Sequence, residues 1–76
     1  MSEVARALID HRRDYGLTQR DLAKMLGITP QFLHDIEHGR RSLKDTRIKA
    51  IKNLELRKRL SFARRCEYQA AIKALM

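Results

Sequence analysis

The chain has 76 residues and carries seventeen Lys and Arg against nine Asp and Glu, a formal net charge of +8. A chain of this length forms one small domain with a modest core and leaves no room for a deep cleft; it also has no recognisable set of nucleophile, base and orienting group, so we expect no enzymatic activity. No apolar run is long enough to span a membrane or to form a signal peptide, so we expect a cytoplasmic protein without a membrane partner.

The first predicted helix runs from Ser2 or Glu3 to Tyr15. Apolar residues recur along this segment at the three- and four-residue spacing that places them on one side of a helix, and Gly16 follows as the residue type that most often ends one. The inner face of this helix is expected to consist of Val4, Ala5, Leu8, Ile9 and Arg12.

The second predicted helix begins after Thr18 and is ended by Gly27. The Thr18 hydroxyl can accept from a backbone N–H of the first turn, and Asp21, three residues later, completes a capping box. Leu17 before the cap and Leu22 within the helix are spaced as a hydrophobic staple. The apolar spacing and the terminal glycine, which favours the left-handed conformation, indicate a short helix of about two turns.

The third predicted helix follows directly, with Thr29 as its cap and Pro30 at the first helical position, where proline costs no hydrogen bond. Leu33 and Ile36 face inward, and Gly39 ends the helix. The opposite side carries four polar residues, Gln31, His34, Asp35 and His38. Two short capped helices joined at a single glycine are the pattern of a helix-turn-helix, here over residues 18–39.

Two further helices complete the predicted bundle. The sequence Ser42-x-x-Asp45 offers another capping box, and the fourth helix is marked by Leu43, Ile48, Ile51 and Leu54. From about residue 56 to 75, apolar residues recur at steps of three and four and predict a C-terminal helix. Such a helix of about twenty residues is about 30 Å long, which is more than this core needs to cover itself.

The distal half of the C-terminal helix is therefore expected to pack on something else. A partner subunit is the simplest candidate. The alternative is a frayed tail, because alanine-rich ends often lack tertiary anchors. The residues expected to contact a partner subunit are Phe62, Cys66, Ala70, Leu75 and Met76.

Cysteine and histidine give no sign of a metal site. Cys66 is the single cysteine, so it cannot form an internal disulfide, and we interpret it as a small buried or interfacial hydrophobe. His34 and His38 lie one helical turn apart, but no carboxylate or cysteine completes a convincing ligand set beside them. We therefore expect no bound metal and no cofactor.

The sequence from about Leu8 to about Leu56 resembles the phage-repressor and Cro type of helix-turn-helix domain, the XRE family. The pattern that carries the resemblance is Leu-Thr-Gln, Leu-Ala and Leu-Gly, followed by hydrophobic-x-x-Ile-Glu-x-Gly. The resemblance implies an all-α fold, in which residues 1–76 form a single compact, lambda-repressor-like bundle of about five helices. It also implies that the third helix enters the major groove of double-stranded DNA, usually as part of a homodimer on a two-fold site.

The family resemblance also implies an internal ion pair. In such domains an Arg late in the first helix commonly pairs with a Glu late in the third, and Arg12 and Glu37 occupy those positions here. We therefore interpret Glu37 as a structural residue. The alternative is two solvated charges, since exposed pairs contribute only about 0 to 1 kcal/mol.

Positive charge is concentrated in the second half of the chain. Residues 39–76 hold twelve Lys and Arg against three carboxylates, a net charge of +9, whereas residues 1–38 hold five against six, a net charge of −1. In this family the loop after the third helix lies against the DNA backbone, and the N-terminus of the second helix favours a phosphate. The phosphate contacts expected on these grounds are Gln19, His38, Arg40, Arg41 and Lys44, while the later charges, such as Arg47 and Lys49, are equally well interpreted as a solvated face.

Base reading is assigned to the outer side of the third helix. Gln31 can present a donor and an acceptor together to adenine, and Asp35 can accept from the amino group of cytosine or instead orient Arg40 and Arg41. Pro30 departs from the polar residue usual in the family and offers only apolar contact, for instance to a thymine methyl group. The full set of candidate base-reading residues is Thr29, Pro30, Gln31, His34 and Asp35.

The function expected from these features is a sequence-specific DNA-binding regulator, a dimeric Cro-like repressor that occupies an operator and associates with the nucleoid when bound. One alternative is an antitoxin-type autorepressor, which also binds a toxin or another protein partner through its C-terminal helix. The other is a protein-interaction module that keeps the fold but has lost specific DNA reading, which Pro30, Phe32 and Asp35 favour.

Overall fold

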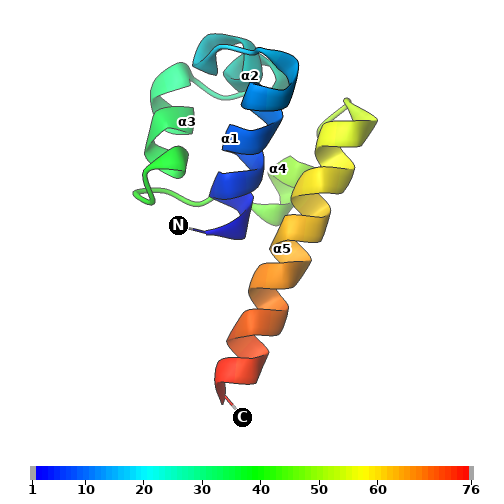
Figure 1. Ribbon diagram of the computed structural model, residues 1–76. Coiled ribbons are helices and arrows are strands. Elements are labelled where there is room, and N and C mark those ends of the chain that lie inside the picture. Colours follow the sequence, from blue (N-terminus) through cyan, green and yellow to red (C-terminus); the bar gives the residue numbers. More distant parts are fainter. Residues whose placement is uncertain (1, 76) are drawn as a thin grey trace.

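The computed structural model describes residues 2–75, and over that range it is built from helices without strands (Figure 1). The predicted all-α bundle is confirmed. The helices in chain order are α1 (Glu3–Tyr15), α2 (Gln19–Leu26), α3 (Pro30–Glu37), α4 (Asp45–Lys49) and α5 (Leu54–Leu75).

Side-chain caps define the starts of the first three helices. Ser2 caps α1 by accepting from the backbone N–H of Ala5 at 3.0 Å. The predicted capping box of α2 is present, because Thr18 Oγ1 accepts from the N–H of Asp21 and Asp21 Oδ2 accepts from the N–H of Thr18, both at 3.1 Å. Thr29 caps α3, with Pro30 in its first turn. Each such cap stabilises a helix by about 1 kcal/mol, so these boundaries are set locally.

The core lies around α1, which sits between α3 and α5 (Figure 1). Its largest fully buried side chains come from all five elements or the loops beside them, and they are Leu8, Leu22, Leu33, Leu43, Leu56, Leu60 and Val4. Ala23 is also buried, and a larger side chain there would separate α2 from its neighbours. The inner face of α1 differs slightly from the prediction, since Ala7 and His11 are buried where Ile9 and Arg12 are only half-buried.

The predicted start of the fourth helix is wrong. The helix begins only at Asp45, after Lys44, which forms no side-chain cap. The Asp45 carboxylate does not cap the backbone near Ser42; it accepts a hydrogen bond of 2.6 Å from the hydroxyl of Tyr68 and lies 3.4 Å from Arg64 Nη1, both on α5. A long-range contact has therefore replaced the local capping box.

The boundary between α4 and α5 also differs from the prediction. Leu54 is 51% exposed and belongs to the first turn of α5, whereas Leu43, Ile48 and Ile51 are buried as expected. Asn53 Oδ1 accepts from the N–H of Leu56 at 2.9 Å, so an asparagine cap starts the last helix. This cap was visible in the sequence and explains why α5 begins two residues before Leu56.

The C-terminal half of α5 extends beyond the rest of the bundle (Figure 1). The last of its contacts with the other helices come from Glu67, whose Oε2 accepts from the N–H of Val4 at 2.8 Å, and from Tyr68 on Asp45. Every residue from 68 to 75 is exposed. None of the described helices is long and apolar enough to cross a membrane.

Candidate DNA interface

The outer side of α3 forms one edge of the molecule, away from α5 (Figure 1). Leu33 and Ile36 are buried against α1 and α2, as the helical spacing predicts. The residues predicted to read bases all come from the N-terminal cap and the outward positions of this helix. Thr29, Pro30 and Gln31 are exposed, and His34 and Asp35 are half-buried. The site is therefore a convex polar edge, the shape that a helix presents to the major groove.

Glu37 holds this edge to the rest of the fold. Its carboxylate is bound by the Arg12 guanidinium, with Nε 3.0 Å from Oε2 and Nη2 3.2 Å from Oε1. Gln19 Nε2 donates to the same Oε1 at 2.7 Å. The Glu37 side chain is 3% exposed, so these charge-assisted bonds compensate for its removal from water. The contact joins one residue from each of α1, α2 and α3.

Gln19 therefore has a structural contact that the sequence did not predict. One of its two side-chain N–H groups donates to Glu37, so the amide orientation is fixed by that contact and only the other N–H remains for a phosphate. The position of the residue is as expected, since Gln19 is the first residue of α2, where main-chain N–H groups lack partners within the helix. A phosphate at this point would be held by the main chain of the first turn.

Asp35 lies at the centre of a second polar cluster, at the C-terminal end of α3. Gln31 Nε2 donates to Asp35 Oδ1 at 3.1 Å, Arg41 Nε lies 3.6 Å from Oδ2, and Arg40 Nη1 lies 4.0 Å from Oδ1. The Arg41 guanidinium also stands over the Phe32 ring, 5.0 Å from its centroid, while Phe32 packs against the core. Of the two roles considered for Asp35, the arrangement matches the one that orients the arginines.

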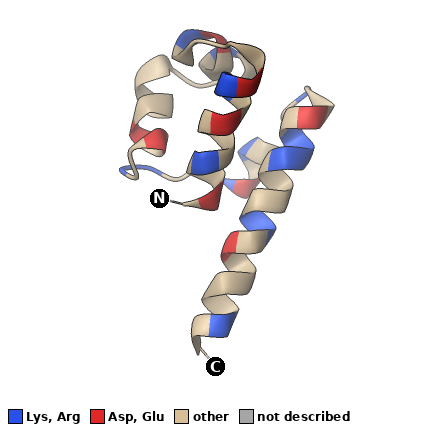
Figure 2. Cartoon of the chain, in the orientation of Figure 1, with Lys and Arg blue, Asp and Glu red and all other residues tan. Residues whose placement is uncertain are grey.

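Figure 2 shows the acidic end of α3 beside the basic loop that follows it. Arg40 and Arg41 are mostly exposed, with 69% and 58% of their side chains accessible, so both can still reach a phosphate. Lys44 is exposed just before α4. Gly39 has φ of +76°, a conformation that other residues adopt rarely, and it turns the chain so that this loop leaves α3 at the same edge.

His34 of α3 and His38, the residue that follows the helix, contact each other. Their rings stack with centroids 4.0 Å apart, and His38 Nδ1 lies 2.7 Å from the carbonyl oxygen of His34. Across residues 2–75 there is no cluster of three or more His, Cys, Asp or Glu side chains that could hold a metal ion.

Several of the later positive charges are structural. Arg59 Nη1 lies 2.9 Å from Asp14 Oδ2, and the Arg64 guanidinium donates to the carbonyl of Leu43 and lies 3.5 Å from Glu67. Arg47 is different, because its guanidinium lies against Gly27 at the turn between α2 and α3. The sequence pattern placed Arg47 among the dispersed charges, and only the fold shows that it lies beside the helix-turn-helix.

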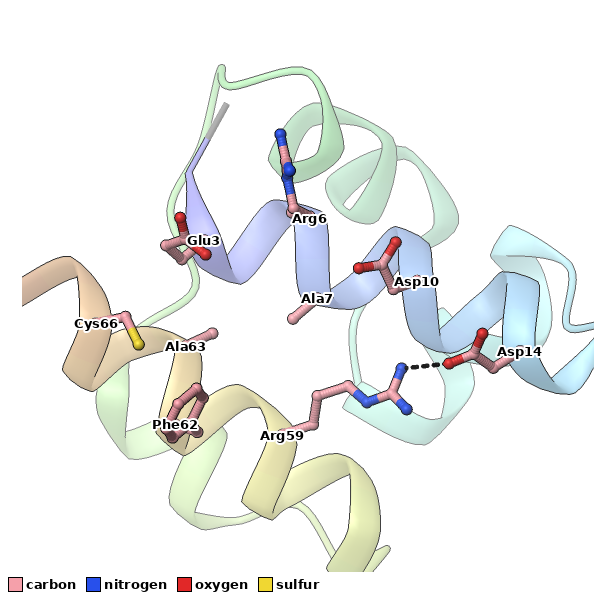
Figure 3. A pocket seen from close by; sticks show the side chains of 9 residues that line it. All are labelled: Glu3, Arg6, Ala7, Asp10, Asp14, Arg59, Phe62, Ala63 and Cys66. Atoms are coloured by element: carbon pink, nitrogen blue, oxygen red, sulfur yellow. Dashed lines mark hydrogen bonds and ion pairs between the residues drawn. The ribbon is translucent and has the colours of Figure 1, made fainter.

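An open surface groove of about 420 Å³ lies between α1 and α5 on another side of the molecule (Figure 3). Phe62 and Cys66, two of the predicted partner contacts, line it together with acidic residues of α1, and the Phe62 side chain is 64% exposed. Phe62, Cys66 and Ala70 are four residues apart and therefore lie in one row along α5. Leu75 comes five residues after Ala70 and lies off that row. Met76 is outside the described residues.

The sequence model of a family described as helix-turn-helix matches residues 8–53, more than half of the chain. The chain therefore belongs to the XRE-type helix-turn-helix family of DNA-binding transcription regulators. Comparison with curated proteins and comparison with solved structures gave no match.

Proposed function

We propose that the protein is a sequence-specific regulator that binds an operator in double-stranded DNA as a homodimer and represses transcription. The observation that carries this proposal is the exposed polar edge of α3, which is anchored from behind by Arg12 and Glu37 and followed at once by basic residues. Repression is the expected outcome because a protein seated on an operator blocks polymerase without needing any further contact.

In the proposed complex α3 lies in the major groove. Gln31 pairs with adenine, Thr29 and Pro30 contact a thymine methyl group, and His34 lies next to them on the same edge. Asp35 faces the same groove and contacts Gln31 instead of a base. The phosphate contacts are the main-chain N–H at Gln19 and the side chains of His38, Arg40, Arg41 and Lys44.

The proposed homodimer uses α5. Phe62 is a large apolar side chain that is mostly in contact with solvent, and Cys66 and Ala70 follow it along one row of the helix. A second copy covering this row would remove that apolar area from water. The dimer would carry two copies of α3, one for each half of a two-fold operator.

The test is selection of random duplex DNA by the purified protein at moderate salt, followed by sequencing of the bound pool. The expected result is an enriched palindrome whose half-sites are about one helical turn, about 34 Å, apart. A single enriched half-site would support specific reading but contradict the dimer. A pool without enrichment would contradict sequence-specific binding.

One further observation favours a protein partner in addition to DNA. Every residue from 68 to 75 of α5 is exposed, and the large side chains of Tyr68, which bonds Asp45, and Ile72 are each more than half exposed. An antitoxin-type autorepressor would bind its toxin through such a segment. The discriminating experiment is co-purification with the product of the adjacent gene, compared between the full chain and a variant with Ile72→Glu. A protein-interaction module that has lost DNA reading would keep the partner and enrich no DNA.

A further inference from the structure

Gln31 and Asp35 are joined by a hydrogen bond on the outer side of α3. They are four residues apart, so their side chains leave the helix on the same side. Gln31 is exposed and its Nε2 donates to Asp35 Oδ1 at 3.1 Å. The proposed base reader is thus already bonded to a neighbour before it meets DNA.

The chemistry of Asp35 fixes which way the Gln31 amide faces. An ionised carboxylate only accepts hydrogen bonds, so it attracts the NH₂ group of the amide and repels the oxygen. The carboxylate is held in turn, because Arg41 Nε lies 3.6 Å from its other oxygen and Arg41 stands on the Phe32 ring. Asp35 is only 18% exposed. The Gln31 oxygen is therefore turned away from Asp35. One of the two N–H groups of the Gln31 amide is already used by Asp35.

We propose that Asp35 is a positioning residue that makes Gln31 select adenine over guanine, an inference that rests on the proposed function. Adenine offers an amino donor and the N7 acceptor in the major groove, which match the outward oxygen and the remaining N–H of the Gln31 amide. Guanine offers two acceptors, O6 and N7, and the outward oxygen repels O6. Without Asp35 the amide can rotate by half a turn and present its NH₂ group to guanine.

This role replaces direct base reading by Asp35. Its Oδ1 is occupied by Gln31 and lies near Arg40, and its Oδ2 lies near Arg41. A carboxylate with its oxygens directed to these groups has less capacity left to accept from a cytosine amino group.

The experiment uses the full chain and the operator obtained by selection. The base pair read by Gln31 is found as the one at which Gln31→Ala loses discrimination. The affinities of wild type, Asp35→Asn and Asp35→Ala are then measured on three duplexes. These carry adenine, guanine or the unsubstituted base purine, which lacks the amino group of adenine, at that position. Wild type is expected to prefer adenine by about tenfold or more over both alternatives.

Asp35→Asn is the decisive variant because Arg41, beside the Oδ2 position, favours the asparagine oxygen there, which leaves the asparagine NH₂ group to donate to the Gln31 oxygen and favour the opposite orientation. Its preference for adenine over guanine is expected to disappear or reverse, while Asp35→Ala, which leaves the amide free, gives an intermediate ratio. An unchanged ratio in a folded Asp35→Asn protein overturns the proposal, and so does equal weakening on adenine and guanine. A Tm close to that of wild type shows that the variant is folded.

A measurement without DNA separates this inference from the proposed function. The side-chain NH₂ resonances of Gln31 in the free protein are expected to shift in Asp35→Asn, because the carboxylate that accepts from this group is lost. Resonances that do not shift overturn the positioning role, whatever the DNA results. A wild type that selects no site overturns the proposed function and the base preference together, whereas a selected site with an unchanged ratio overturns only the inference.

Discussion

Glu37 shows how one residue can decide the stability of this interface. A nearly buried carboxylate is tolerated because side chains from two other helices donate to it: Arg12 bonds both of its oxygens, and Gln19 adds a second bond to Oε1. The pairing with Arg12 was predicted from the family pattern, because the two positions are fixed by the fold. The Gln19 contact was not predicted, since an exposed position at a helix start says nothing about the direction of its side chain.

Breaking this contact from one side is expected to be costly. Arg12→Ala leaves the Glu37 carboxylate buried without its charged partner, so the free energy of unfolding should fall by about 3 to 5 kcal/mol, the range for a buried ion pair. This change in the free energy of unfolding is measured by urea unfolding, monitored by circular dichroism. The matched control is Arg59→Ala, which breaks the more exposed pair with Asp14 and should cost about 1 kcal/mol or less. Equal losses in the two variants would contradict the structural role of Glu37.

His11 makes stability depend on pH. It is buried beside Tyr15, and burial, followed by the nearby positive charge of Arg59, holds its pKa below the ordinary value of 6.5. The folded protein therefore favours the neutral ring. Its contribution to stability is complete above pH 6.5 and is lost as the pH falls through the lowered value, because the unfolded chain takes up the proton first.

We expect His11→Gln to reduce the difference in unfolding free energy between about pH 7.5 and about pH 5. Urea unfolding at both pH values gives the difference directly. A difference that persists unchanged in His11→Gln would show that another group is responsible.

Some helix boundaries are determined by contacts between neighbouring residues, and others are determined by contacts between residues far apart in the chain. The boundaries of α1, α2 and α3 were predicted because each cap lies within three residues of the N–H group that it satisfies. The start of α4 was mispredicted because the partner of Asp45 is Tyr68, 23 residues away. The same distinction applies to the site. The outer face of α3 follows from helical spacing, whereas the place of Arg47 at the turn does not.

The loop after α3 and the outer face of α3 are expected to contribute differently to DNA binding. Charge reversal at Arg40 and Arg41 should weaken binding to all sequences and lower the salt dependence, with a slope reduced by about 0.9 for each phosphate that is no longer neutralised. Gln31→Ala should instead reduce discrimination at one base pair, by about 1 to 3 kcal/mol. Fluorescence anisotropy at several salt concentrations separates the two effects.

Lys73→Glu is the matched control for the charge reversals. It changes the net charge in the same direction but lies on the distal part of α5, far along the chain from the polar edge. It should leave affinity almost unchanged. If it weakened binding as much as the change at Arg40 or Arg41, the attraction would come from total charge and the proposed docking would be wrong.

At the scale of the whole molecule, α3 and α5 occupy opposite sides of α1 (Figure 1). A partner on α5 therefore leaves the polar edge free, and self-association and base reading can be changed separately. The length of α5 was predicted from its spacing. The assignment of the partner contact to Phe62, Cys66 and Ala70 stays a prediction, because Phe62, Tyr68 and Ile72 are similarly exposed in the single chain.

Phe62→Glu is expected to weaken self-association by about tenfold or more, because it puts a charge into the apolar row proposed for the dimer. Sedimentation measures this, and binding to a single half-site should be unaffected. Gln69→Glu places the same charge at an exposed position on the same helix and serves as the control. Dimers that persist equally in both variants would exclude this row as the interface.

The hydrogen bond between the Val4 N–H and Glu67 has a consequence for how the chain folds during synthesis. The two residues are 63 positions apart, so the Val4 N–H in the first turn of α1 finds its acceptor only after α5 has emerged from the ribosome as far as Glu67. The reading unit is complete long before then, yet α1, which it packs against, is still open to solvent. We expect a nascent chain stalled before Glu67 to be digested by protease and to bind no DNA, which couples regulatory competence to the synthesis of α5.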